Sequence, residues 1–174
     1  MGSPIARSSS DRPPGAASPG ERLREVVLGE ADRRAILAEA EAAGRRECCG
    51  LLVGRCAGGQ ALVRGVVPAR NVAGEPERFF EIDPRVLLAT HRQAREAGEA
   101  ILGWYHSHPG GDSRPSACDA ERAVEASKVW LVVAGGVIGA YVAEEDGAIA
   151  GRFRPLPLRV ISGRDEKEAG YGNR

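Results

Sequence analysis

Long apolar runs are missing from this sequence: no stretch of about 18 or more consecutive apolar residues occurs, and no transmembrane helix is expected. The N-terminal region also lacks a continuous apolar stretch after its basic residues, which argues against a secretory signal. We therefore expect a cytoplasmic protein whose four cysteines are reduced.

An excess of one charge is missing as well. The chain has 24 basic and 24 acidic residues and a formal net charge of zero. Nothing in this balance indicates a broad basic surface, so neither nucleic acid nor a membrane surface is an expected partner. Lysine is scarce, and the arginines that replace it are scattered along the chain without forming a binding pattern.

The cysteines lack the paired C-x-x-C spacing of a structural zinc site. Cys48 and Cys49 are adjacent and would point to opposite faces of a strand, so both cannot serve one simple bridge. Cys49 and Cys118 lie beside the motifs described below. Each has two open interpretations, a metal ligand or a small buried apolar residue.

Hydrophobic residues make up 43% of the 174 residues and charged residues 28%, which is typical of one globular domain with its own core. The ends are rich in Ser, Pro, Gly or charge without apolar periodicity. We therefore expect disordered segments at 1–21 and 163–174 around a single folded domain at 22–162. Predicted strands and helices are mixed without strict alternation, which favours an α+β fold with one sheet and flanking helices.

Apolar runs and turn residues together set the expected elements. Helices are predicted at 31–43, closed by Gly44, at 84–96, with Asp83 as N-cap and Pro84 at the first helical position, and at 116–127. Strands are predicted at 48–53, 61–67, 79–82, 101–106, 129–134, 137–143 and 149–153, the first of them ending at Gly54.

Two of the three histidines fall in the string His106-Ser107-His108-Pro109, directly after an apolar strand. On an extended segment, side chains two residues apart point to one face, so both imidazoles can meet one metal ion. The predicted strand would hold them rigidly, and Pro109 would end it. His-x-His alone also occurs by chance, so the pair needs further ligands to mean a metal site.

A third ligand is available in Ser116-Ala117-Cys118-Asp119. With Ser116 as N-cap, Asp119 lies in the first helical turn and its carboxylate can turn back beside the histidines. Two His and one carboxylate leave a fourth position for water, the arrangement of catalytic zinc. The same four residues can also be only a capping box, and the two interpretations stay open at this point.

A general base would complete such a site, and Glu47 is a candidate. It precedes the apolar residues 48–53, a costly place for a carboxylate without a partner. The simpler interpretation is a charged residue at a strand start. It is the joint spacing of the two histidines, Asp119, Ser116 and Glu47 that favours chemistry over coincidence.

Residues 106–119 resemble, without a gap, the signature of the JAB/MPN/JAMM metalloprotease family: H-S-H-P, six residues, S, two residues, D. Residues 47–54, ECCGLLVG, are similar to the first-strand signature of the same family. The resemblance covers about residues 22–160 and is to catalytically competent members, since no ligand is missing. It implies a mixed sheet with flanking helices, layered as in cytidine deaminases.

The resemblance also implies roles for individual residues. One Zn²⁺ per chain would be held by His106, His108 and Asp119, Glu47 would be the general base, and Ser116 would donate a hydrogen bond to the oxyanion. Because the loop from Gly110 to Pro115 is short, the chain looks like the small stand-alone prokaryotic members. These are peptidases or isopeptidases that act after a Gly-Gly C-terminus of ubiquitin-like or sulfur-carrier proteins.

Two other functions stay open: a non-catalytic module that binds a ubiquitin-like tail, and a zinc hydrolase of a small-molecule amide. Asp112 and Arg114 either contact substrate or are simply solvated. His91 is expected on a helix surface, Trp104 and Trp130 in the core. Phe79 and Phe80 are expected in the core and beside a substrate groove.

Overall fold

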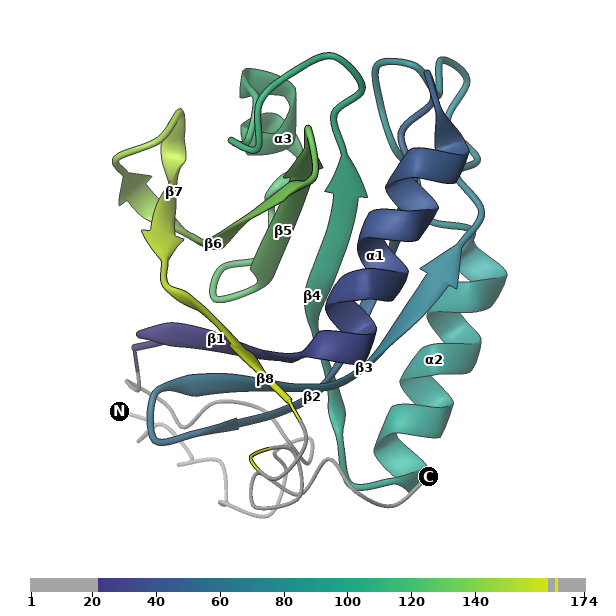
Figure 1. Cartoon of the computed structure of the whole chain (residues 1–174). Helices are drawn as coiled ribbons and strands as arrows, with labels where there is room; N and C mark the ends of the chain where they lie inside the picture. The colour runs from purple at the N-terminus through teal and green to yellow at the C-terminus, as the bar shows by residue number, and fades with distance from the viewer. Residues whose placement is uncertain (1–21, 163–164, 166–174) are drawn as a thin grey trace, which may run out of the picture.

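One curled, eight-stranded mixed sheet forms the body of the protein in the computed structural model, which describes residues 22–162 and residue 165 (Figure 1). The strand order is β7-β6-β5-β4-β2-β3-β1-β8, and the pairs β1·β3, β1·β8 and β4·β5 are parallel. The strands are β1 Glu25–Gly29, β2 Cys49–Ala57, β3 Gln60–Ala69, β4 Ala100–Ser107, β5 Val129–Ala134, β6 Val137–Gly147, β7 Gly151–Leu156 and β8 Leu158–Ile161.

Three helices accompany the sheet in the described ranges: α1 Glu30–Ala43, α2 Pro84–Glu96 and α3 Ala117–Arg122. This confirms the predicted α+β class. In Figure 1, α1 lies in front of the sheet and α3 sits at the end where β4 and β5 finish. None of these helices is long and apolar enough to cross a membrane.

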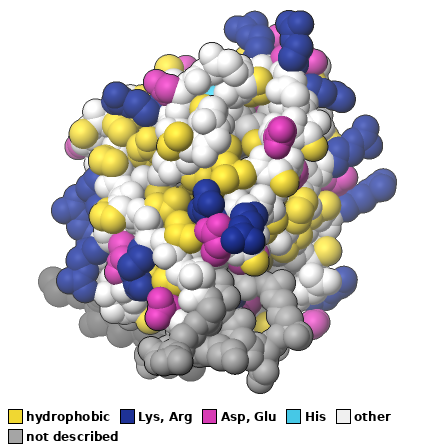
Figure 2. Space-filling view, in the orientation of Figure 1, with side chains coloured by type: hydrophobic (Ala, Val, Ile, Leu, Met, Phe, Trp, Pro, Cys, Tyr) yellow, Lys and Arg dark blue, Asp and Glu magenta, His cyan; other side chains and the backbone are white. Residues whose placement is uncertain are grey.

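The core lies on both faces of the sheet because the central strand β5 is apolar and buried at every position. In β5, Val129, Leu131 and Val133 pack on the face covered by α1, while Trp130 and Val132 pack on the other face. This is the alternation that a pleated strand requires. On the face shown in Figure 2, positive and negative side chains are interspersed around apolar patches.

Several predicted elements are confirmed. Gly44 ends α1 with a φ of 62°, and the side chain of Asp83 accepts a hydrogen bond from the Arg85 amide to cap α2, with Pro84 at its first turn. Gly58 and Gly59 form the turn between β2 and β3 with positive φ. All four cysteines lie in the described residues and none forms a disulfide, and Cys48 and Cys49 lie in different core clusters, on opposite faces.

Other predictions were wrong. The run 79–82 is not a strand: Ile82 makes only an isolated bridge with Asn71. β2 does not end at Gly54 but continues to Ala57 through a bulge. Gly54 is needed there because a Cβ would lie 2.0 Å from the Leu62 carbonyl oxygen. Strands β1 and β8 were not predicted, and β7 begins at Gly151, later than expected.

The helix predicted over 116–127 is also too long. α3 ends at Arg122, where the chain turns with a hydrogen bond from the Val124 amide to the Arg122 carbonyl. The Arg152 side chain donates to the Ala123 carbonyl at 2.5 Å and so satisfies a group that a longer helix would have used. The predicted domain range 22–162 and its disordered flanks stay predictions, and segments 1–21 and, apart from residue 165, 163–174 lie outside the described residues.

Candidate metal centre

His106 lies near the end of β4, between β2 and β5, and is completely buried. His108 follows the strand and is partly exposed. Their Nε2 atoms are 3.0 Å apart, as expected for side chains two residues apart on extended backbone. The Phe80 ring stacks on the His106 ring with centroids 4.4 Å apart and an interplanar angle of 19°. The position of His106 is therefore fixed from several sides.

Asp119 reaches both histidines from the first turn of α3. Its Oδ1 lies 3.3 Å from His106 Nε2, and its Oδ2 lies 3.3 Å from His108 Nε2. The helix start holds the carboxylate in place: Ser116 donates its amide at 2.6 Å and its hydroxyl at 2.7 Å to Oδ2, and the Asp119 amide donates to Ser116 Oγ at 3.1 Å. The predicted capping box is present.

The three side chains have the spacing of metal ligands. His106, His108 and Asp119 each offer an atom, and these atoms lie within 4.8 Å of one another. Tetrahedral zinc with bonds of about 2.0–2.2 Å places its ligand atoms about 3.3 Å apart. The two Nε2 atoms are 3.0 Å apart, and each lies 3.3 Å from a different oxygen of Asp119, which is close to that spacing. The group is consistent with a metal site.

The hydrogen bond at the second ring nitrogen of His108 determines which of its nitrogens carries the proton. His108 Nδ1 lies 3.1 Å from the Asp112 carbonyl oxygen, which can only accept a hydrogen bond. Nδ1 therefore carries the proton in the neutral ring, and the Nε2 lone pair faces the other two ligands. The loop residue Asp112 thus acts through its backbone, a role that the sequence did not indicate.

Burial and hydrogen bonds at the centre favour a neutral His106 and an ionised Asp119, the protonation states in which these side chains bind a metal. Burial lowers the pKa of His106, which keeps its ring neutral. Burial alone would raise the pKa of Asp119, but hydrogen bonds with both histidines outweigh it and hold that pKa well below its usual range. Burial also opposes protonation of His108, yet the contact with Asp119 raises its pKa. Metal binding would displace a proton there.

Glu47 lies two residues before the start of β2 and is 7% exposed. The register of β2 on β4 pairs Cys49 with His106, and this brings Glu47 to the end of the sheet where the metal ligands are. Burial raises the pKa of Glu47 to about 7, with smaller effects of opposite sign from His108 and Asp119. A buried carboxyl group with a pKa near neutrality can both accept and release a proton.

The other residues that the sequence singled out lie outside the group of possible metal ligands. The side chain of Asp112 accepts a hydrogen bond from the Arg114 amide, and Arg114 itself is exposed. Cys118 is not part of the group of possible metal ligands found in the described residues. The other candidates are placed as follows: Cys49 is buried in the core, His91 is exposed on α2, Trp130 is buried, Trp104 packs beside it and Phe80 is in the core.

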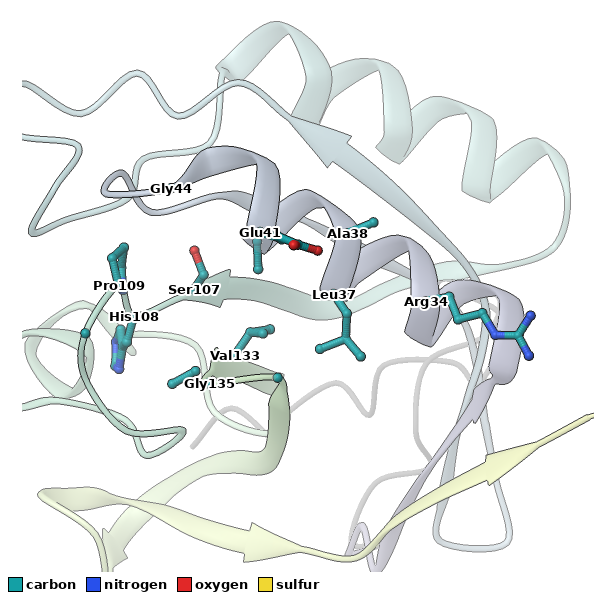
Figure 3. A pocket seen from close by; sticks show the side chains of 14 residues that line it. Arg34, Leu37, Ala38, Glu41, Gly44, Ser107, His108, Pro109, Val133 and Gly135 are labelled. Atoms are coloured by element: carbon teal, nitrogen blue, oxygen red, sulfur yellow. The ribbon is translucent and has the colours of Figure 1, made fainter.

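An open pocket of about 550 Å³ runs up to this centre from the α1 side (Figure 3). His108 and Pro109 lie at one end of it, and Arg34 lies toward the other. In between, Leu37 of α1 faces Val133 of β5. Gly44, Gly110, Gly135 and Gly136 also line it, so part of its wall is bare backbone.

Comparison with known proteins agrees with this geometry. A family model described as prokaryotic homologues of the JAB domain matches residues 30–149, which include every ligand and Glu47. The chain belongs to this family. The solution structure of a protein from Desulfitobacterium hafniense is similar in fold, with a TM-score of 0.72 and 27% identity over 86% of this chain and 99% of that one.

Two relatives of this JAB-domain chain carry functional names. A desampylase from Haloferax volcanii is 38% identical over 86 residues, which cover 49% of this chain and 60% of the relative. A probable TtuB-protein conjugate cleaving protease from Thermus thermophilus is 36% identical over 90 residues, covering 52% of this chain and 60% of the relative. The match therefore spans less than two thirds of either relative.

Sequence reasoning missed two residues next to the centre. Asn71 bonds the backbone of Glu47, and Arg122 donates to the Phe80 carbonyl at 2.6 Å while its guanidinium lies 5.1 Å from the Phe79 ring centroid. Arg122 also acts on Glu47, lowering its pKa slightly against the effect of burial. Asn71 carries one local signal, an Asx turn. Its long-range bonds depend on the fold.

Proposed function

We propose that this chain is a zinc-dependent peptidase or isopeptidase that cleaves after the Gly-Gly C-terminus of a ubiquitin-like or sulfur-carrier protein. One Zn²⁺ per chain would be held by His106, His108 and Asp119, with Glu47 as general base. The observation that carries the proposal is the convergence of three ligand atoms within 4.8 Å next to a buried carboxyl group whose pKa is about 7.

When bound, zinc would act as a Lewis acid that polarises the scissile carbonyl and acidifies a water molecule. The other steps belong to the chain. Glu47 takes one proton from the attacking water, and oxygen adds to the carbonyl carbon. Glu47 then gives that proton to the leaving nitrogen as the C–N bond breaks, so a carboxylic acid and a free amine result, and the acid loses its remaining proton to solvent. A pKa near neutrality suits both transfers.

Ser116 is the proposed donor to the oxyanion of the tetrahedral intermediate. Its side chain is exposed enough to meet a substrate, although in the structure its hydroxyl donates to Asp119 Oδ2 at 2.7 Å. The Asp119 carboxylate and the oxyanion would therefore compete for one hydroxyl proton, whereas the helix cap uses Ser116 Oγ as an acceptor. Preorganised donors of this kind typically contribute 10²–10³-fold to kcat.

The substrate class rests on two supports. The relatives named above include a protease whose name states that it cleaves TtuB-protein conjugates. The pocket beside His108 offers backbone at Gly110 and Gly135 to a thin, extended chain, and backbone groups can pair with an added strand. Glycines next to the cut bond would allow the tail to approach these walls closely.

The test is incubation of zinc-loaded protein with ubiquitin-like fusions that carry a Gly-Gly junction, followed by mass spectrometry of the products. We expect cleavage after the second glycine, strong inhibition by a Gly→Ala change at the junction and loss of activity with a chelator. Equal cleavage of unrelated unfolded peptides would make the protein a general peptidase. Tight binding of the tail without any cleavage would instead favour the non-catalytic module.

If no Gly-Gly fusion is either bound or processed, the substrate class proposed above is wrong. A screen of small-molecule amides with the same zinc-loaded protein would then test the remaining alternative. Glu47→Gln is the control in each assay, because it should retain zinc while losing turnover.

A further inference from the structure

Asn71 follows β3 and makes four side-chain hydrogen bonds to the backbone of segments far apart in the sequence. Its Nδ2 donates to the Glu47 carbonyl at 3.0 Å and to the Phe79 carbonyl at 2.9 Å. Its Oδ1 accepts from the amides of Ala73 and Glu81, both at 3.0 Å. One partly buried amide thus links the start of β2 to both ends of the segment 72–81.

The orientation of this amide group is determined by its partners. Carbonyl oxygens only accept and backbone amides only donate, so Nδ2 must face Glu47 and Phe79 while Oδ1 faces the other two groups. Two donors and two acceptor sites are all occupied. No other side chain of similar size presents both functions in this geometry, since Asp lacks the donors and Ala lacks both.

One of the Asn71 bonds, the one to the Glu47 carbonyl, falls on the peptide unit that follows Glu47. On its other side, the Glu47 amide donates to the Pro76 carbonyl at 2.7 Å, within the same segment that Asn71 closes. The next residue is held too, because the Cys48 amide donates to Ser107 Oγ at 2.8 Å. Backbone bonds on both sides of Glu47 leave its Cα little freedom to shift.

The segment that Asn71 closes also touches the metal ligands. Its Phe80 ring stacks on His106, and Arg122 donates to the Phe80 carbonyl. The positions of the base and of one ligand therefore both depend on this single piece of backbone. It has no regular secondary structure to stiffen it. The Asn71 side chain bonds that piece at both ends, next to the backbone bond from the Val72 amide to the Glu81 carbonyl at 2.9 Å.

We propose that Asn71 is a positioning residue for the reaction: through the Nδ2 bond to the Glu47 carbonyl it sets the distance between the Glu47 carboxylate and the reacting atoms. The inference rests on the proposed function, because it takes Glu47 as the base. Misplacement of a catalytic group by about 1 Å can cost about 10²-fold in rate. Asn71 itself touches neither substrate nor metal.

A double-mutant cycle tests this with the full, zinc-loaded chain and a Gly-Gly fusion. Asn71→Ala should lower kcat by about 10- to 100-fold with KM changed less than about twofold. In the Glu47→Gln background the same change should have no further effect, because the group it positions is already gone. Glu75→Gln, an exposed change in the same segment, is the matched control and should leave kcat unchanged.

Asn71→Asp tests the donor and the acceptor functions of the Asn71 amide separately. It keeps an acceptor for the amides of Ala73 and Glu81 but replaces the donor that faces Glu47. Hydrogen exchange should show both amides protected in Asn71→Asp and exposed in Asn71→Ala, whereas kcat should fall in both variants. Zinc content and thermal melting are measured on each. If Asn71→Ala does not fold, Asn71→Asp carries the same cycle.

Equal losses of kcat in both backgrounds would overturn the inference and leave Asn71 with a structural role only. Wild-type kcat in Asn71→Asp would overturn it as well, because the Nδ2 bond would then be dispensable. Those results would not affect the proposed function. Full turnover of Glu47→Gln is the separate outcome that sinks the assignment of the base, and the role of Asn71 falls with it.

Discussion

Replacing Glu47 by glutamine keeps the size of a buried side chain and removes its charge. The wild-type side chain is 7% exposed, and burial raises its pKa from the ordinary 4.5 to about 7. Because a tenfold change in a protonation constant corresponds to about 1.4 kcal/mol, ionised Glu47 costs the folded state about 3 kcal/mol relative to the unfolded chain. Glutamine does not carry this cost.

The raised pKa gives the pH dependence its sign. Below about pH 4.5, Glu47 is protonated in both the folded and the unfolded state and does not lower the free energy of unfolding. As the pH rises from there through about 7, the unfolded chain releases the proton before the folded protein does, so the free energy of unfolding falls. In metal-free protein, the free energy of unfolding of Glu47→Gln should therefore exceed that of the wild type by an amount that grows with pH, up to about 3 kcal/mol. Urea denaturation at about pH 5 and about pH 8 measures it.

The same variant should be nearly inactive. With zinc loaded, kcat should fall by about 10²–10⁴-fold, the usual contribution of a general base, while the zinc content stays unchanged. A protein that is more stable and less active would show that the carboxylate is kept for chemistry at a cost to folding. A stability difference that does not vary with pH would refute the burial argument, and near-normal turnover would refute the assignment of the base.

Three further outcomes are expected. His108→Ala should lower bound zinc, measured by elemental analysis, well below one per chain without unfolding the protein. The control His91→Ala, on the exposed surface of α2, should bind zinc normally. The reverse result would overturn the ligand set. Ser116→Ala should lower kcat by roughly 10²-fold, and a loss of about 1 kcal/mol in stability with kcat unchanged would leave only the helix cap. Burial raises the pKa of the Cys48 and Cys49 thiols to about 11 and about 12, so neither should react with iodoacetamide at about pH 8 until the protein is unfolded; fast labelling of the folded protein would contradict this.

The arrangement of the ligands was predictable because it depends on local geometry. Extended backbone places His106 and His108 on one face, and an N-cap places Asp119 in the first turn of its helix. Both rules act within a few residues, and the structure shows the Nε2 atoms 3.0 Å apart and the capping box formed. The central strands were predictable for a similar reason, since continuous apolar runs bounded by glycine leave few alternatives.

The elements that were missed or misplaced owe their form to distant partners. β1 and β8 have five and four residues, and they exist as strands because they pair with each other and because β1 also pairs with β3. The run 79–82 has strand-forming residues but finds no strand to pair with beyond one bridge. β-propensity is weak without neighbours, so pairing decided these cases.

The sequence by itself determined the proposed ligand set, the caps and the apolar centre of the sheet, and through them the family resemblance. Only the tertiary structure brought Glu47 to the histidines, by the register of β2 on β4, and gave its carboxyl group a pKa near 7 by burying it. The same holds for Asn71: beyond its local Asx turn with Ala73, its other three bonds reach backbone groups 8 to 24 residues away. Burial and long-range hydrogen bonds are properties of the packed chain, and no window of neighbouring residues contains them.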